Sequence, residues 1–183
     1  VAACNATIRG GVGWTNRLLE IDYGIRVDMQ HIIFRNGYQP DYIGGAISNH
    51  GILTLTDSLV YSNTAQYGGG LYNGSGATLT LINTTVSSNT ATTDYGGGLS
   101  NWGTAYINNT VFEKNASIRG GSGFYNSEGG SVIMAGGIIT GNLTDTPSSN
   151  HGGGAFNAGW LSMTNTQIIS NYSRWDGGGF AND

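Results

Sequence analysis

A six-residue phrase built on glycine and ending in asparagine recurs six times along this chain. It reads GGAISN at 44–49, GGGLYN at 68–73, GGGLSN at 96–101, GSGFYN at 121–126, GGGAFN at 152–157 and GGGFAN at 177–182. Its final asparagines are 24, 28, 25, 31 and 25 residues apart. Self-similarity at a nearly fixed spacing is typical of a solenoid, in which each repeat contacts only its neighbours. The phrase therefore predicts a stack of similar rungs.

A second phrase ending in asparagine interleaves with the first. It reads IFRN at 33–36, VYSN at 60–63, VSSN at 86–89, FEKN at 112–115, ITGN at 139–142 and IISN at 168–171. Between the two phrases lie alternating runs such as LTLT at 53–56 and TLTL at 78–81. Short segments that alternate apolar with polar residues and stop at Gly or Asn indicate strands and turns. We therefore predict an all-β, right-handed parallel β-helix with about 25 residues and three short strands per rung.

Aligned repeats predict three apolar columns that form the core. The first column holds Ile47, Leu71, Leu99, Phe124, Ala155 and Phe180, and the second holds Ile33, Val60, Val86, Phe112, Ile139 and Ile168. The third side is filled by Leu53, Leu55, Leu79, Leu81, Ala105, Ile107, Leu161 and Met163. No rung can bury its apolar face alone, so neighbouring rungs must stack.

The asparagines that end the two phrases form two further columns. The first contains Asn49, Asn73, Asn101, Asn126, Asn157 and Asn182, and the second contains Asn63, Asn89, Asn115, Asn142 and Asn171. Stacked amides hydrogen-bond from rung to rung, and Asn tolerates the left-handed backbone of tight bends. We expect both columns to be structural ladders.

The repeats indicate a single domain over residues 1–183. Residues 1–35 lack the glycine-rich phrase and are expected to form irregular first rungs, residues 36–183 the regular repeats, and residues 143–150 a surface loop inserted between two repeats. Neither end contains an amphipathic helix that would cap the stack. We expect the open backbone groups there to pair with flanking repeats of a longer chain, or with further copies end to end.

The composition narrows the classes of partner. Charged residues make up 10% of the chain and the net charge is −4, without clusters, so we expect neither nucleic acid nor an anionic membrane as partner. No apolar stretch approaches the roughly 20 residues that span a bilayer. Cys4 is the single cysteine, and the three histidines have no metal-ligand spacing. We predict no cofactor and no metal site.

Seven asparagines lie in N-x-S/T sequons, the acceptor pattern for N-linked sugars. They are Asn5, Asn73, Asn83, Asn108, Asn115, Asn142 and Asn171. Four of them belong to the ladder columns, where an inward amide cannot carry a sugar. Asn83 and Asn108, at the ends of the middle strands, are the better candidates, and their modification depends on the host.

Aromatic side chains recur next to the first asparagine column. The residue before that asparagine is Tyr72, Tyr125 or Phe156 in three repeats, and Trp102 and Trp160 follow the same turn. These positions are expected to point outward, where aromatic rings can stack on glycans or contact a partner chain. The alternative is ordinary packing beneath loops.

The repeats also resemble known surface proteins. The alternation of GGAISN with FEKN resembles the repeats of chlamydial polymorphic outer-membrane proteins, and GGGLYN…LTLINTTVSSNTA at 68–91 is similar to the parallel β-helix repeats of large secreted proteins of filamentous environmental bacteria. This resemblance implies a passenger or stalk region at the cell surface, used in adhesion or as extracellular structure.

Parallel β-helices also house pectin-cleaving lyases and glycoside hydrolases, so fold alone leaves activity open. Hydrolysis needs two carboxylates roughly 5–9.5 Å apart, whereas the 11 acidic residues here scatter at one or fewer per rung after residue 41. We predict an extracellular or cell-surface structural protein, a segment or subunit of a fibre or stalk. An adhesin passenger that binds glycans through the aromatic face is the first alternative, and a polysaccharide-active enzyme is the second.

Overall fold

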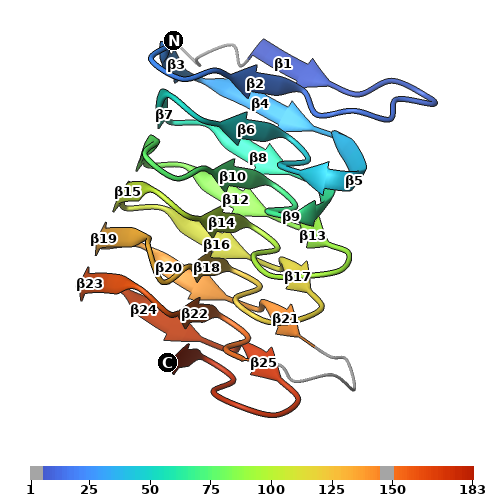
Figure 1. The fold of residues 1–183 in the computed structure, drawn as a ribbon. Coiled ribbons are helices and arrows are strands. Elements are labelled where there is room, and N and C mark those ends of the chain that lie inside the picture. Colours follow the sequence, from blue (N-terminus) through green and yellow to red (C-terminus); the bar gives the residue numbers. More distant parts are fainter. Residues whose placement is uncertain (1–5, 145–150) are drawn as a thin grey trace, which may run out of the picture.

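The computed structural model describes residues 6–144 and 151–183, and these contain strands and turns but no helix. The strands stack in parallel into a β-solenoid of about seven turns, with about 26 residues per turn. Figure 1 shows the turns lying one below another, with the two chain ends at opposite ends of the stack. The prediction of an all-β solenoid with this repeat is confirmed.

Each full turn passes through four sheets, which we name A to D. Sheet A comprises β1 (Ala6–Arg9), β4 (Ile32–Arg35), β8 (Leu59–Tyr61), β12 (Thr85–Ser87), β16 (Val111–Glu113), β20 (Ile138–Thr140) and β24 (Gln167–Ile169). Sheet B comprises β2 (Leu19–Ile21), β6 (Ile47–Asn49), β10 (Leu71–Asn73), β14 (Leu99–Asn101), β18 (Phe124–Asn126), β22 (Ala155–Asn157) and β26 (Phe180–Asn182). Sheet C comprises β3 (Arg26–Gln30), β7 (Ile52–Thr56), β11 (Thr78–Ile82), β15 (Thr104–Asn108), β19 (Ser131–Ala135) and β23 (Trp160–Thr164).

Sheet D was not predicted, so the expectation of three strands per rung is wrong. It comprises β5 (Tyr38–Ile43), β9 (Thr64–Tyr67), β13 (Thr90–Ala91), β17 (Ala116–Ser117), β21 (Leu143–Thr144) and β25 (Tyr172–Ser173). Four of these strands, β13, β17, β21 and β25, are only two residues long, and each directly follows an asparagine of the second column. A strand this short has no alternation that a sequence pattern can detect.

The core runs along the axis of the solenoid between the sheets. Residues of the three predicted columns pair rung to rung, as Ile47 does with Leu71 and Leu71 with Leu99, and those of the middle turns are almost fully buried. The prediction that Ile33 belongs to the second core column is wrong. Ile33 pairs with Leu59, whereas Phe34 pairs with Val60 and is the fully buried residue of that turn.

The reason for the shift at Phe34 lies in the following turn. Arg35 pairs with Tyr61, so Gly37 and not Asn36 lies opposite Asn63, and the Gly37 N–H donates to Asn63 Oδ1 at 2.8 Å. Counting back from Asn36 therefore selects the wrong residue by one position.

At the bend between sheets A and D, the left-handed backbone lies at the residue before the asparagine and not, as expected, at the asparagine itself. Ser62, Ser88 and Lys114 have φ values of 55°, 54° and 53°, and each directly precedes a ladder asparagine. The ladder asparagines themselves are absent from the residues with positive φ. The ladder asparagines thus serve the bend through the hydrogen bonds of their side chains and not through a left-handed backbone.

The first two residues of the predicted loop at 143–150 form a strand, so the expectation is wrong for them. Leu143 and Thr144 form β21, where Leu143 pairs with Ala116 on one side and with Tyr172 on the other. Residues 145–150 lie outside the described residues, as do Cys4 and the sequon residue Asn5.

Candidate functional site

The two asparagine columns form continuous hydrogen-bonded ladders. In the first, each side-chain amide from Asn49 onward donates to the next, with N–O distances of 2.7–2.8 Å through Asn73, Asn101, Asn126, Asn157 and Asn182. In the second, the distances are 2.9–3.0 Å through Asn63, Asn89, Asn115, Asn142 and Asn171. These amides are committed to the interior and are not free to hold a ligand.

The sequons divide according to the same ladders. Asn73, Asn115 and Asn142 are buried and donate to a neighbouring asparagine, and Asn171 donates to the Ile139 carbonyl at 2.8 Å. By contrast, Asn83 and Asn108 are exposed. Asn83 lies in a left-handed turn with φ 48°, and its side chain donates to Asp57 at 3.2 Å across an exposed surface. Of the described sequon asparagines, Asn83 and Asn108 are exposed, Asn171 is partly buried, and the other three are buried.

The expectation of one exposed aromatic face is wrong for two residues. Tyr125 and Phe156 are 8% and 4% exposed. Tyr95 stacks on Tyr125 at 4.5 Å between ring centroids, and His151 stacks on Phe156 at 5.0 Å. For Tyr125 and Phe156 the alternative prediction, packing beneath loops, is the correct one. Loop residues before the glycine-rich phrase supply the cover.

The remaining predicted aromatics are accessible. Trp102 and Trp160 are 39% and 58% exposed, and Tyr72 is half-buried. Trp160 lies in β23 near the far end of the stack. Tyr72 and Trp102 instead line one hollow of about 130 Å³ together with Ile43 and Tyr67. We call this group of four residues the aromatic hollow.

The aromatic hollow lies where sheet D leads into sheet B. Ile43 and Tyr67 pair across β5 and β9, so they form one wall from two successive turns. Tyr72 in β10 and Trp102 after β14 form the other side. Ile43 and Tyr67 were not among the predicted contact residues. The dipeptide Tyr-Gly before the glycine-rich phrase, at Tyr67 and again at Tyr95, was the available signal.

Buried contacts hold the walls of the hollow in place. The Tyr72 ring lies 6.0 Å from His50, whose Nε2 is 3.1 Å from Ser48 Oγ. Trp102 packs edge-on against Tyr125 at 6.3 Å. Burial raises the pKa of the Tyr72 hydroxyl.

One polar group adjoins the hollow. The Tyr67 hydroxyl hydrogen-bonds the Asp94 carboxylate, and this contact, followed by burial, raises the pKa of Tyr67. Asp94 is 7% exposed as a residue and lies 3.9 Å from the guanidinium of Arg119. The hollow is therefore apolar on its walls, with a charge-balanced acid and base beside it.

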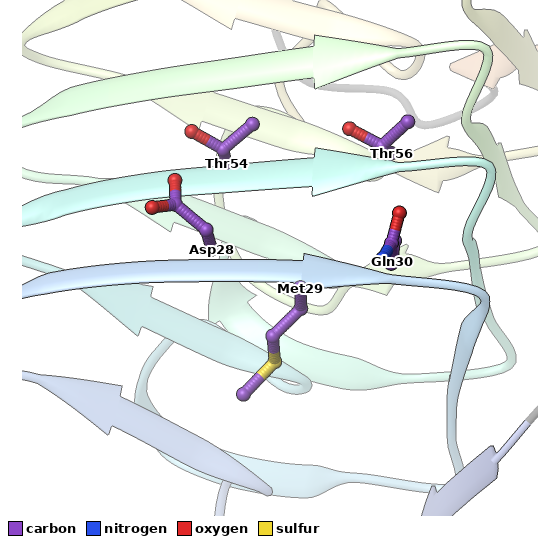
Figure 2. A pocket seen from close by; sticks show the side chains of 5 residues that line it. All are labelled: Asp28, Met29, Gln30, Thr54 and Thr56. Atoms are coloured by element: carbon purple, nitrogen blue, oxygen red, sulfur yellow. The ribbon is translucent and has the colours of Figure 1, made fainter.

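A second, polar hollow lies on the outer face of sheet C. Figure 2 shows Asp28 and Gln30 of β3 beside Thr54 and Thr56 of β7, with Met29 pointing the other way. The Arg26 guanidinium donates to Asp28 at 2.9 Å. This bond, and then one from Thr54, lowers the pKa of the Asp28 carboxyl. Among its lining residues Asp28 is the one carboxylate, whereas glycoside hydrolysis needs a pair.

Neither hollow offers metal chemistry. Among residues 6–144 and 151–183, no three His, Cys, Asp or Glu side chains gather closely enough to hold an ion. Over the same ranges there is no helix long and apolar enough to cross a bilayer.

Comparisons with protein-family models, curated proteins and solved structures give no match for this chain. The structure supports the resemblance to bacterial surface repeats at the level of a parallel β-solenoid. Such folds occur both in structural proteins and in polysaccharide enzymes, so the fold alone leaves the function open.

Proposed function

We propose that this chain is a structural segment of an extracellular or cell-surface fibre or stalk, of the kind found in bacterial surface β-helix repeat proteins. The observation that carries the proposal is the unbroken rung-to-rung pairing of sheets A, B and C and of both amide ladders. In such an array each rung stabilises the next through nearest-neighbour contacts, so length can grow without a new core. A stiff spacer needs this property, and a catalyst does not.

Apolar side chains are partly exposed in the turn that holds β23, β24 and β26. Leu161, Met163, Ile168 and Phe180 are partly exposed there, whereas their counterparts in the middle turns are fully buried. A further rung on this turn would cover the apolar side chains and satisfy the backbone of the outermost strands. We propose that flanking repeats or a second copy of the chain supply that rung.

Immunogold electron microscopy of cells from the natural source tests the proposal. Antibodies raised against residues of this chain should label filaments or stalks outside the cell envelope, and antibody preadsorbed with the purified protein should give no label. Label confined to the cell interior would refute the proposal. Dispersed surface label without filaments would retain the location but refute the fibre.

A glycan-binding adhesin passenger is the second candidate, and the aromatic hollow favours it. The two functions are compatible, because the hollow lies on the side of the rod and the proposed axial contacts lie at its end. The third candidate, a polysaccharide-active enzyme, has no described pair of carboxylates lining either hollow in its favour.

A further inference from the structure

We propose that the aromatic hollow of Ile43, Tyr67, Tyr72 and Trp102 binds one neutral hexopyranose unit of a glycan. Ligand sites are concave and mostly apolar, with a few polar groups that fix orientation. The hollow meets each condition, with three aromatic side chains, one aliphatic side chain and the Tyr67 hydroxyl beside it.

The size of the hollow limits the ligand to one ring at a time. Its volume of about 130 Å³ lies below the roughly 300–1,000 Å³ of pockets for drug-sized molecules. A sugar ring presents a flat apolar C–H face and a rim of hydroxyls. Aromatic walls of this kind suit that face, and the open side leaves the rest of a glycan chain in solvent.

The polar edge selects a neutral sugar over a charged one. Asp94 lies 3.9 Å from Arg119 and accepts a hydrogen bond from Tyr67, so its charge is already compensated. Because Asp94 and Arg119 are already paired with each other, a uronate would find no unpaired cation at this edge and an amino sugar no unpaired carboxylate. Hydroxyl groups can instead share this network as both donors and acceptors without bringing a charge.

The walls are preorganised, which lowers the entropic cost of binding. Tyr72 packs near His50, and His50 is held by Ser48 at 3.1 Å. Trp102 is 39% exposed but rests edge-on against the buried ring of Tyr125, and its indole N–H donates to Ser100 Oγ at 3.3 Å. The exposed part of each ring is therefore available while its position is fixed.

Nuclear magnetic resonance of the indole N–H groups tests the proposal directly. The chain has four tryptophans, and Trp102→Phe assigns the signal of interest. Cellohexaose, laminarihexaose, maltohexaose and mannohexaose serve as neutral probes, and hexagalacturonate serves as the charged comparison. We expect at least one neutral probe to shift the Trp102 signal in a saturable manner, and hexagalacturonate to bind more weakly.

Two variants and a matched control locate the site. Isothermal titration calorimetry, which does not depend on the Trp102 signal, should show that Tyr72→Ala and Trp102→Ala each weaken binding about tenfold or more. Tyr106→Ala, which removes an exposed tyrosine from sheet C, should leave binding unchanged. Circular dichroism checks that each variant is folded, and Trp102→Ala keeps the test valid if Tyr72→Ala is not.

Three results would overturn the proposal. The first is no saturable shift at Trp102 with any neutral probe at millimolar concentration. The second is an equal loss of binding in Tyr106→Ala. The third is a Trp102 shift that follows protein concentration without sugar, which would identify a second copy of the chain as the occupant. None of these results bears on the location of the protein outside the cell, which the immunogold experiment tests separately.

Discussion

The side-chain oxygen of Asn89 accepts two hydrogen bonds from Asn63 in the preceding turn, one from the backbone N–H at 3.0 Å and one from the side-chain amide at 2.9 Å. The Asn89 amide in turn donates to the Val60 carbonyl and to Asn115 Oδ1, each at 3.0 Å. Each asparagine of the second ladder thus replaces backbone pairing at the bend between sheets A and D, where the strands themselves are interrupted.

Replacing Asn89 with alanine is expected to destabilise the fold strongly. The substitution leaves the Asn63 backbone N–H without its acceptor and removes the Asn89 donor from the Val60 carbonyl, and both asparagines are fully buried. The Asn63 side-chain amide keeps the Phe34 and Tyr61 carbonyls as acceptors. Unsatisfied buried groups cost about 1–3 kcal/mol each, so we expect a loss of about 2–4 kcal/mol. Equilibrium unfolding in urea, followed by circular dichroism, measures it. The exposed Asn108→Ala is the control and should stay within about 0.5 kcal/mol of the parent. Equal losses in both variants would contradict a special role for the ladder.

Gly98 is expected to tolerate no side chain, because neighbouring turns approach it closely. A Cβ added there would lie 2.4 Å from the Gly123 carbonyl oxygen of the next turn. Gly98→Ala should therefore cost about 1–3 kcal/mol through overpacking. Gly11 has no heavy atom within 4 Å of an added Cβ, so Gly11→Ala should be neutral or slightly stabilising. Thermal melts of both variants test this pair, and an unchanged melting temperature for Gly98→Ala would show that the turns can separate.

Much of this fold was predictable, because close stacking imposes residue types that recur. Glycine is required where a carbonyl of the next turn leaves no room, as at Gly98, and an apolar residue is required at each inward position, as at Leu71. The offset at Phe34 was not predictable in this way. Asn36 imitates the asparagine of the second column, while Gly37 holds the equivalent backbone position and donates to Asn63.

The surface was less predictable than the core. The alternation of apolar and polar residues correctly placed the Tyr125 ring outside the solenoid interior. It could not show that another side chain would cover this ring. Tyr95, 30 residues away in sequence, stacks on that ring because a loop between sheets D and B folds over it. The aromatic hollow also depends on the region between sheets D and B, because Ile43 and Tyr67 lie at the ends of β5 and β9, just before that connection. Loop conformation depends on contacts between turns, and the repeat pattern does not encode it.

Expression in a eukaryotic secretory host should glycosylate only two of the described sequons. Asn83 and Asn108 are exposed, whereas Asn73, Asn115 and Asn142 are buried in the ladders, and a sugar on any of these three would disrupt the stack. Asn171 is partly buried, and its amide is held by Asn142 and the Ile139 carbonyl. Enzymatic release of the glycans in H₂¹⁸O converts each modified asparagine to labelled aspartate, which peptide mass spectrometry identifies. Label at Asn83 or Asn108 alone is the expected result. Label on a ladder asparagine of correctly folded protein would contradict the arrangement of the amides.

Alkaline pH should destabilise the protein partly through Tyr125. Burial, reinforced by Tyr95 and nearby carboxylates, raises the pKa of this hydroxyl to about 12, whereas a tyrosine in an unfolded chain ionises near 10. Because the folded state holds the proton more tightly, this contribution is fully present below about pH 10 and is lost as the pH rises towards about 12.

Tyr125→Phe removes the ionisable group and keeps the ring against Tyr95. Its melting temperature should therefore fall less steeply than that of the parent across the same alkaline range, as measured by circular dichroism melts at successive pH values. Tyr106→Phe, at an exposed position on sheet C, should reproduce the slope of the parent. Parallel curves for the parent and Tyr125→Phe would mean that the hydroxyl ionises at an ordinary pH, and that the cover formed by Tyr95 opens readily in solution.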